Sequence, residues 1–324
     1  RDYAKRIEAA AGSSTNIELY MREERFGGNG PLFARALLGA DVPVKYIGTL
    51  GYPQIVPTFQ HFAEQTNALS LANPGITYAL EFEDGKIMQG LMAHFAEITY
   101  AQLIARVGEG ALWDALSRAD CIGIMNWTMM PHQSDILEQI LIHGLSQIPP
   151  HPGRFFILDP ADPQKRSRSD LLAYLKILAR YEAFGKVILT VNLKEAGEIA
   201  AALGIQAEIT GHSPDSLAQQ ARIIRQQLNI HCFVIHHSHC TAAATADGEA
   251  VGIEVPFCTV PKTSTGAGDH FNAGFALGEL MGFTVREKLL MATATSGHYV
   301  RTATVPSWSA IDNFFDQWKN GTLI

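Results

Sequence analysis

Short apolar runs that alternate with amphipathic segments constrain this chain more than any other feature of its sequence. The runs CIGIM, FFILD and KVILTV are followed by segments of helical periodicity at 134–143, 170–181 and 194–203. Such short apolar runs are typical of strands that are buried on both faces. Each following helix can carry the chain back across the sheet, so that the next strand runs parallel to the one before. The alternation predicts an α/β fold in which helices cover both faces of a mostly parallel sheet.

Two Asp-Gly pairs predict β-hairpins in addition to this alternation. Asp84-Gly85 lies between extended segments at 76–82 and 86–90, and Asp247-Gly248 lies within 241–253. Glycine accepts the positive φ that a tight hairpin turn requires. Together with an extended segment at 17–26, the first hairpin is expected to form a small sheet separate from the main one.

Length, charge and cysteine spacing favour a globular cytosolic enzyme. The 324 residues include 32 acidic and 25 basic ones, and the net charge of -7 disfavours nucleic acid or an anionic membrane as partner. No stretch has the length and apolar character of a membrane helix, and residues 1–11 are too charged for a secretory signal. The four cysteines lack CxxC spacing, as expected for reduced thiols. We therefore expect a cytoplasmic protein.

The segment TSTGAGDHFNAGF at 263–275 carries the strongest indication of chemistry. Gly266 and Gly268 permit a tight turn at the start of a helix, where free N–H groups and the helix dipole favour an anion. Asp269 follows them and is placed to accept the proton of an attacking hydroxyl in phosphoryl transfer. A plain loop with Asp269 as a helix cap is the alternative, and an isolated GxGD pattern does not exclude it.

Three segments in order resemble the ribokinase, or PfkB, family of carbohydrate kinases. The TGAGD and FNAGF strings are similar to the C-terminal signature of that family, FGGNGPLFARALLGA at 26–40 to its N-terminal glycine motif, and TVNLKE at 190–195 to its Asn-x-x-Glu motif. The resemblance implies a ribokinase-like three-layer αβα sandwich with a small β-sheet lid. The core would comprise residues 27–73 and 97–324, and the N-terminal segment and lid would comprise 1–26 and 74–96.

The resemblance also implies a reaction, the transfer of the γ-phosphoryl group of ATP, with Mg²⁺, to a hydroxyl of a monosaccharide or sugar derivative. A hydroxymethyl group is the expected acceptor. Asp269 would be the base, and the backbone amides of Gly266, Ala267 and Gly268 would hold the charge of the transferring group. A nucleoside kinase of the same fold and a catalytically silent sugar-binding relative are the alternatives. Lids in this family often pair between subunits, so a homodimer through the lid is also expected.

The other two motifs have roles in the family as well as simpler structural interpretations. Gly27 and Gly28 let backbone N–H groups approach a sugar, and Asn29 offers donor and acceptor atoms to its hydroxyls. Asn192 and Glu195 would hold Mg²⁺ through water. A strand-to-helix turn is the alternative for the glycines, and a capping box is the alternative for Asn192 and Glu195.

The nucleotide loop departs most from the family pattern. VIHHSHCT at 234–241 stands where the family shows Thr-x-Gly-x-x-Gly, so His236 and Ser238 place side chains at nucleotide-binding positions, with Thr265 as a third contact. The string also suggests a metal site, but neighbouring residues of a strand point to opposite faces. His237 and His239 would therefore share one face without further ligands, and packing is the better interpretation.

Further departures leave the substrate and the cation open. The family's first strand with its sugar-binding aspartate does not precede residue 17, so either the natural N-terminus lies outside this sequence or that contact is gone. Thr263 replaces an aspartate that in some relatives helps to bind a monovalent cation. The sequence therefore names neither the sugar nor a potassium dependence. The basic cluster Lys165, Arg166 and Arg168 is interpreted as a solvated loop. His270, which follows the candidate base, is interpreted as a solvent-facing or packed imidazole and not as a phosphate ligand.

Overall fold

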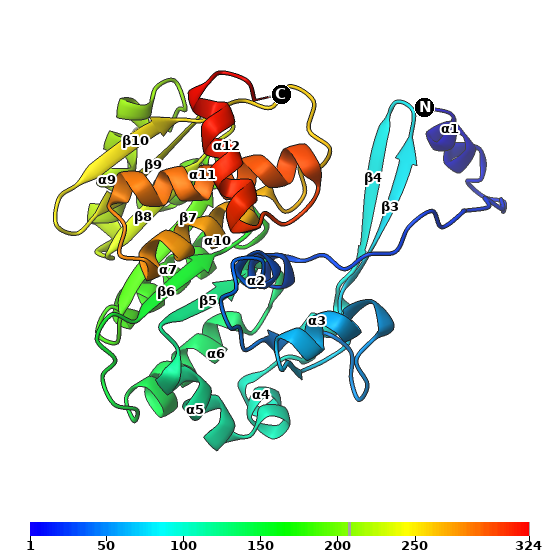
Figure 1. The fold of residues 1–324 in the computed structure, drawn as a ribbon. Coiled ribbons are helices and arrows are strands. Elements are labelled where there is room, and N and C mark those ends of the chain that lie inside the picture. Colours follow the sequence, from blue (N-terminus) through cyan, green and yellow to red (C-terminus); the bar gives the residue numbers. More distant parts are fainter. Residues whose placement is uncertain (207–208, 324) are drawn as a thin grey trace.

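A six-stranded sheet forms the centre of the computed structural model, which describes residues 1–206 and 209–323 (Figure 1). The strand order is β10-β9-β8-β7-β6-β5. The strands are β5 (Cys121–Met125), β6 (Phe155–Asp159), β7 (Lys186–Asn192), β8 (Cys232–His236), β9 (Cys240–Thr245) and β10 (Ala250–Glu254). β5 to β8 run parallel, and β9 and β10 are antiparallel to their neighbours. The predicted parallel sheet and the hairpin at Asp247-Gly248 are thus confirmed.

Helices cover both faces of this sheet, which makes the ribokinase-like three-layer αβα sandwich (Figure 1). One face packs against α6 (Gln133–Gln139), α7 (Arg168–Tyr181), α8 (Leu193–Leu203) and α9 (Pro214–Leu228). The other packs against α2 (Asn29–Leu38), α10 (Ala267–Leu280), α11 (Val285–Thr302) and α12 (Trp308–Lys319). No helix within the described residues is long and apolar enough to cross a membrane.

The side chains of each central strand point alternately into the two cores, which explains why the strand sequences are largely apolar. In β6, Phe156 and Leu158 enter the core under α6–α9, while Phe155 and Ile157 enter the core under α2 and α10–α12. Side chains of a strand point alternately to its two faces, so a strand covered on both faces must be apolar throughout. Each such buried side chain contributes about 1.5–3 kcal/mol.

Two smaller sheets lie beside the sandwich. β1 (Ile47–Gly48) pairs in parallel with β2 (Leu69–Ser70), close to α3 (Gln60–Gln65), α4 (Tyr100–Val107) and α5 (Glu109–Arg118). β3 (Ile76–Phe82) and β4 (Gly85–Leu91) form the predicted hairpin, which projects away from the sandwich (Figure 1). Almost all of its residues are exposed. We refer to β3 and β4 as the lid.

The lid has two strands, so the prediction that residues 17–26 form a third is wrong. Five of the ten residues in IELYMREERF are charged, and they do not alternate with apolar ones, so the segment presents no apolar face to the hairpin. The short helix α1 (Asp2–Ala9) contacts the lid tip instead. The Tyr3 and Phe82 ring centroids are 5.1 Å apart, and the amino group of Arg1 lies 3.2 Å from a carboxylate oxygen of Asp84.

The basic cluster is only partly the solvated loop that the sequence predicted. Arg166 donates to four backbone carbonyls of the segment that follows β5, those of Trp127, Thr128, Met130 and Pro131, and its guanidinium lies over the Trp127 ring. Arg168 donates twice to the carbonyl of Ala202, while Lys165 forms an exposed ion pair with Asp162. Arg166 thus ties the loop after β6 to the loop after β5, a contact that charge alone does not predict.

Candidate active site

The carboxyl ends of the parallel strands bring polar residues to one edge of the sheet. β6, β7 and β8 end at Asp159, Asn192 and His236, and Asn126 follows β5. Met125 is in register with Asp159, and Asn192 with His236. Open α/β sheets bind their ligands at this edge. The candidate site therefore lies at the edge of the sheet where open α/β folds bind their ligands.

Asp269 lies in the first turn of α10, where only 4% of its surface is exposed. Nδ2 of Asn29, the first residue of α2, donates to its Oδ1 at 3.0 Å. Burial raises the pKa of Asp269 to about 7, and the hydrogen bond from Asn29 opposes this rise. Two motifs that are 240 residues apart in sequence therefore meet at this carboxyl group.

The glycine turn before Asp269 has the backbone that the sequence predicted. Gly266 caps α10 with φ +92°, a left-handed conformation that favours glycine, and a Cβ there would lie 2.8 Å from Cδ1 of Leu32. The N–H of Ala267 lies 3.3 Å from the carbonyl oxygen of Ser264, at the long end of a turn hydrogen bond. The turn thus brings backbone N–H groups to the helix N-terminus beside the candidate base.

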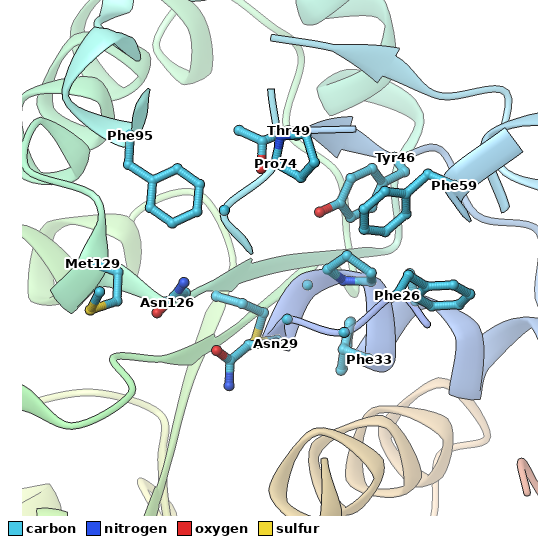
Figure 2. Close-up of a pocket in the computed structure, with 18 of the residues that line it drawn as sticks. Phe26, Asn29, Phe33, Tyr46, Thr49, Phe59, Pro74, Phe95, Asn126 and Met129 are labelled. Carbon is cyan, nitrogen blue, oxygen red and sulfur yellow. The ribbon is translucent and has the colours of Figure 1, made fainter. Parts of the chain in front are cut away.

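A cleft of about 2500 Å³ extends from the lid to Asn29, Asn126 and Thr265. Gly28 has φ +91° and caps α2, so that Asn29 begins the helix inside the cleft. Figure 2 shows Asn29, Asn126 and Tyr46 around one space, with Phe95 and Met129 on the same side as Asn126, and Tyr46 on the other. The sequence did not single out Asn126 or Tyr46, although an Asn directly after a buried parallel strand is a recognisable signal.

Asn192 and Glu195 form the capping box that was the structural alternative. Oδ1 of Asn192 accepts from the N–H of Glu195 at 3.0 Å, and Oε2 of Glu195 accepts from the N–H of Asn192 at 2.9 Å. Oε1 of Glu195 accepts from the N–H of Asp162 at 2.7 Å. Burial raises the pKa of Glu195. All three side-chain oxygens are therefore engaged, which leaves their remaining lone pairs for water.

Asp159 is a buried carboxyl group that the sequence prediction missed. Its oxygens accept from the N–H of Ala161 at 2.9 Å and from Nδ2 of Asn272 at 2.8 Å. Burial, then the nearby carboxyl groups of Glu195 and Asp269, raise the pKa of Asp159 well above its ordinary value. The signal was available, because an acidic residue that ends the buried run FFILD lies at the ligand-binding edge.

Of the residues predicted to bind the nucleotide, His236 and Thr265 lie beside the glycine turn. His236 packs on Phe271 with ring centroids 5.0 Å apart, and a Cβ on Gly268 would lie 3.3 Å from its Cε1. Burial lowers the pKa of His236 to about 4, whereas Ser238 is exposed. Thr265 directly precedes the turn.

The other histidines that the sequence singled out lie outside the strands. The His237 and His239 ring centroids lie 5.5 Å apart in the turn between β8 and β9, so the assumption that both residues are on one strand is wrong. Residues 1–206 and 209–323 contain no group of three His, Cys, Asp or Glu residues that could hold a metal ion. His270 is fully buried against Tyr299, so of the two expected surroundings, solvent or packing, the structure shows packing.

The similarity of this chain to known proteins identifies its family. A family model for prokaryotic ketohexokinases matches residues 2–318. The chain belongs to that family. A ketohexokinase of Haloferax volcanii is 28% identical over 320 residues, which cover 96% of this chain and 81% of the relative.

Solved structures of sugar and nucleoside kinases share the fold. The ribokinase of Arabidopsis thaliana complexed with ribose and ATP gives a TM-score of 0.67 at 15% identity, covering 92% of this chain and 90% of that one. The adenosine kinase of Schistosoma mansoni in complex with 2-fluoroadenosine gives 0.66 at 14% identity, covering 88% and 82%. At such identities the likeness shows the ribokinase-like fold alone. The family membership makes the chain an ATP-dependent PfkB carbohydrate kinase, as the three motifs predicted.

Proposed function

We propose that the chain transfers the γ-phosphoryl group of ATP to a hydroxymethyl oxygen of a ketohexose, with Asp269 as the base. The observation that carries this proposal is the position of Asp269. It is buried at the N-terminus of α10, it directly follows the glycine turn, and Asn29 holds its side chain. A ketohexose is the proposed acceptor because the matching family model and the Haloferax volcanii relative both bear that description.

In the proposed reaction, the acceptor hydroxyl loses its proton to Asp269 as its oxygen bonds to the γ-phosphorus. The bond between this phosphorus and the oxygen that bridges to the β-phosphorus breaks, and ADP leaves with that oxygen. Asp269 then releases the proton to water. A pKa raised to about 7 suits this role better than the ordinary 3.8, since a base works best when its pKa lies near the working pH.

Backbone amides of Gly266, Ala267 and Gly268 would stabilise the charge on the transferring group. Such donors are effective because they are already oriented when the charge develops. On the acceptor side, Nδ2 of Asn29 orients the base, which leaves Oδ1 to accept from a sugar hydroxyl. Gly27 and Gly28 would allow the backbone to approach the same sugar closely.

We place the ATP against His236, Ser238 and Thr265, at the carboxyl end of β8 and before the glycine turn. Asn192 and Glu195 fit a hydrated Mg²⁺ only, because their oxygens already accept backbone N–H groups and would reach the ion through its water molecules. When bound, Mg²⁺ would offset the negative charge of the phosphates.

The lid would act with the N-terminal segment, residues 1–26 and 74–96, as a cover over the core formed by 27–73 and 97–324. A cleft of about 2500 Å³ is far larger than one monosaccharide, so closure is needed to exclude water from the phosphoryl group. Apolar side chains on one face of the exposed lid, such as Tyr78 and Ile87, would pack against a second copy in a homodimer. Sedimentation of the purified chain tests that assembly.

A coupled ADP-release assay with Mg·ATP tests the reaction. The acceptors are ketohexoses, aldohexoses, pentoses and nucleosides, and Asp269→Asn is assayed alongside. We expect turnover with a ketohexose, lost in the variant. A preference for nucleosides would replace the proposal by the nucleoside-kinase alternative, and binding of sugar without phosphorylation of any acceptor would favour the silent relative.

A further inference from the structure

Two stacked side chains hold adjacent carbonyl groups of the glycine turn. The rings of His270 and Tyr299 have centroids 3.6 Å apart and planes 11° apart. Nδ1 of His270 lies 2.8 Å from the carbonyl oxygen of Gly266, and the Tyr299 hydroxyl donates to the carbonyl oxygen of Thr265 at 3.3 Å. A carbonyl oxygen only accepts, so Nδ1 of His270 must carry the proton. The ring is neutral at physiological pH, because burial lowers the pKa of His270 to about 4.

A third side chain holds the next carbonyl group. The Ser296 hydroxyl donates to the carbonyl oxygen of Ala267 at 2.9 Å. Ser296 and Tyr299 are three residues apart on α11, so both reach the turn from one face of that helix. α10 and α11 pack closely, since a Cβ on Gly274 would lie 2.7 Å from Cα of Ala292. This packing fixes α11 relative to the turn.

The geometry of the peptide bond connects these three carbonyls to the three amides of the proposed anion site. In a planar trans peptide, the C=O of one residue and the N–H of the next point in opposite directions. Holding the carbonyl of Thr265 therefore sets the direction of the Gly266 N–H. In the same way, the carbonyls of Gly266 and Ala267 set the N–H directions of the residues that follow them.

We propose that Tyr299, His270 and Ser296 are positioning residues that orient the amide donors of the glycine turn without touching the substrates. This inference rests on the proposed role of those amides in phosphoryl transfer. Donors that are held in place lower the barrier because they need not reorient as charge develops. Loss of one support should lower kcat, while the KM values for sugar and ATP stay close to those of the wild type, since ground-state contacts are kept.

The test uses substitutions that remove one hydroxyl each. Tyr299→Phe keeps the stack on His270, and Ser296→Ala removes the smallest possible group. We expect each to lower kcat roughly 5- to 30-fold, less than the loss of a whole oxyanion donor. Thr293→Val on the same helix and Tyr174→Phe are the matched controls, because neither buried hydroxyl has a hydrogen-bond partner within the described residues. Both controls should retain wild-type kcat.

A rescue variant separates positioning from packing at His270. His270→Asn places an amide N–H near the position of Nδ1, whereas His270→Ala removes the donor, so the Asn variant should retain several-fold more kcat than the Ala variant. Affinity for ADP with aluminium fluoride and the sugar, which mimics the transferring group, should fall by the same factor as kcat. Binding of the sugar alone, measured by calorimetry, should be unchanged.

Two results distinguish failure of the inference from failure of the proposed function. If the wild type is active but Tyr299→Phe and Ser296→Ala match the two controls, the positioning role is refuted. It is also refuted if KM rises as much as kcat falls. If the wild type phosphorylates no acceptor, or if Asp269→Asn remains active, the proposed reaction is wrong and the positioning role fails with it.

Discussion

Replacing Asp269 by Asn should abolish turnover and, at the same time, stabilise the folded chain at neutral and alkaline pH. The side chain is 4% exposed, and burial raises its pKa from the ordinary 3.8 to about 7. Asn has nearly the same size, and its amide oxygen can still accept from Asn29. Because Asn carries no charge, the free-energy cost of burying a carboxylate disappears.

The size of this gain depends on pH in a defined direction. Between pH 3.8 and about pH 7 the unfolded chain has released the Asp269 proton while the folded chain retains it, so stability falls as pH rises. At about 1.4 kcal/mol per pH unit, the cost is under about 2 kcal/mol at pH 5 and levels off near roughly 4 kcal/mol above pH 7. The variant should exceed the wild type in stability by about these amounts, taken as upper values.

Urea unfolding of both proteins at pH 5, 7 and 8 measures the difference, and Asp312→Asn at an exposed position of α12 serves as the matched control. ADP release should fall by about 10²- to 10⁴-fold in Asp269→Asn, the usual contribution of a positioned base. If the variant gained no stability between pH 5 and pH 8, the argument from burial would be refuted. Turnover within tenfold of the wild type would refute the role as base.

Three further perturbations test other parts of the site. The kcat of the wild type should rise with pH and level off above about pH 7, as the Asp269 proton is lost; a flat kcat from pH 5.5 to 8.5 would contradict this. Gly266→Ala should lower the free energy of unfolding by about 1–2 kcal/mol and reduce activity, because φ is +92° and the new Cβ would meet Leu32. The control is Gly197→Ala, whose Cβ would have no neighbour within 4 Å, and thermal unfolding should show its stability equal to or higher than that of the wild type. Glu195→Gln should lower the free energy of unfolding by about 1–3 kcal/mol, because the amide group of Gln cannot accept from both the Asp162 and the Asn192 N–H. It should also raise the Mg²⁺ concentration needed for half-maximal activity, and an unchanged Mg²⁺ requirement would argue against a place for Glu195 beside the ion.

The parts of the fold that the sequence predicted are those with strong local signals. Most residues of the runs at β5, β6 and β7 are apolar because helices cover both faces of the sheet, and the two Asp-Gly pairs satisfied a requirement of the backbone. The turn at Gly266 was predictable for the same reason, since its φ is +92°. The family membership later agreed with motifs that were recognised in sequence order.

The parts that escaped prediction depend on contacts between distant segments. Nothing near Asn29 indicates that its amide would meet Asp269, and nothing near Ser296 indicates that it would hold a carbonyl of the glycine turn. Arg166 was interpreted from its basic neighbours, although its guanidinium binds backbone carbonyls that are about 36–39 residues away in sequence. The contacts of such side chains become known only when the positions of the helices and strands are known.

The exposure of the lid has a consequence for how acceptor preference can change over evolutionary time. β3 and β4 pair along their whole length, yet nearly every side chain of the hairpin faces solvent. A two-stranded ribbon of this kind adds little to the stability of the domain that carries it. Substitutions in the lid can therefore accumulate without unfolding the sandwich, so the proposed cover over the acceptor is freer to diverge than the sandwich that carries the proposed base.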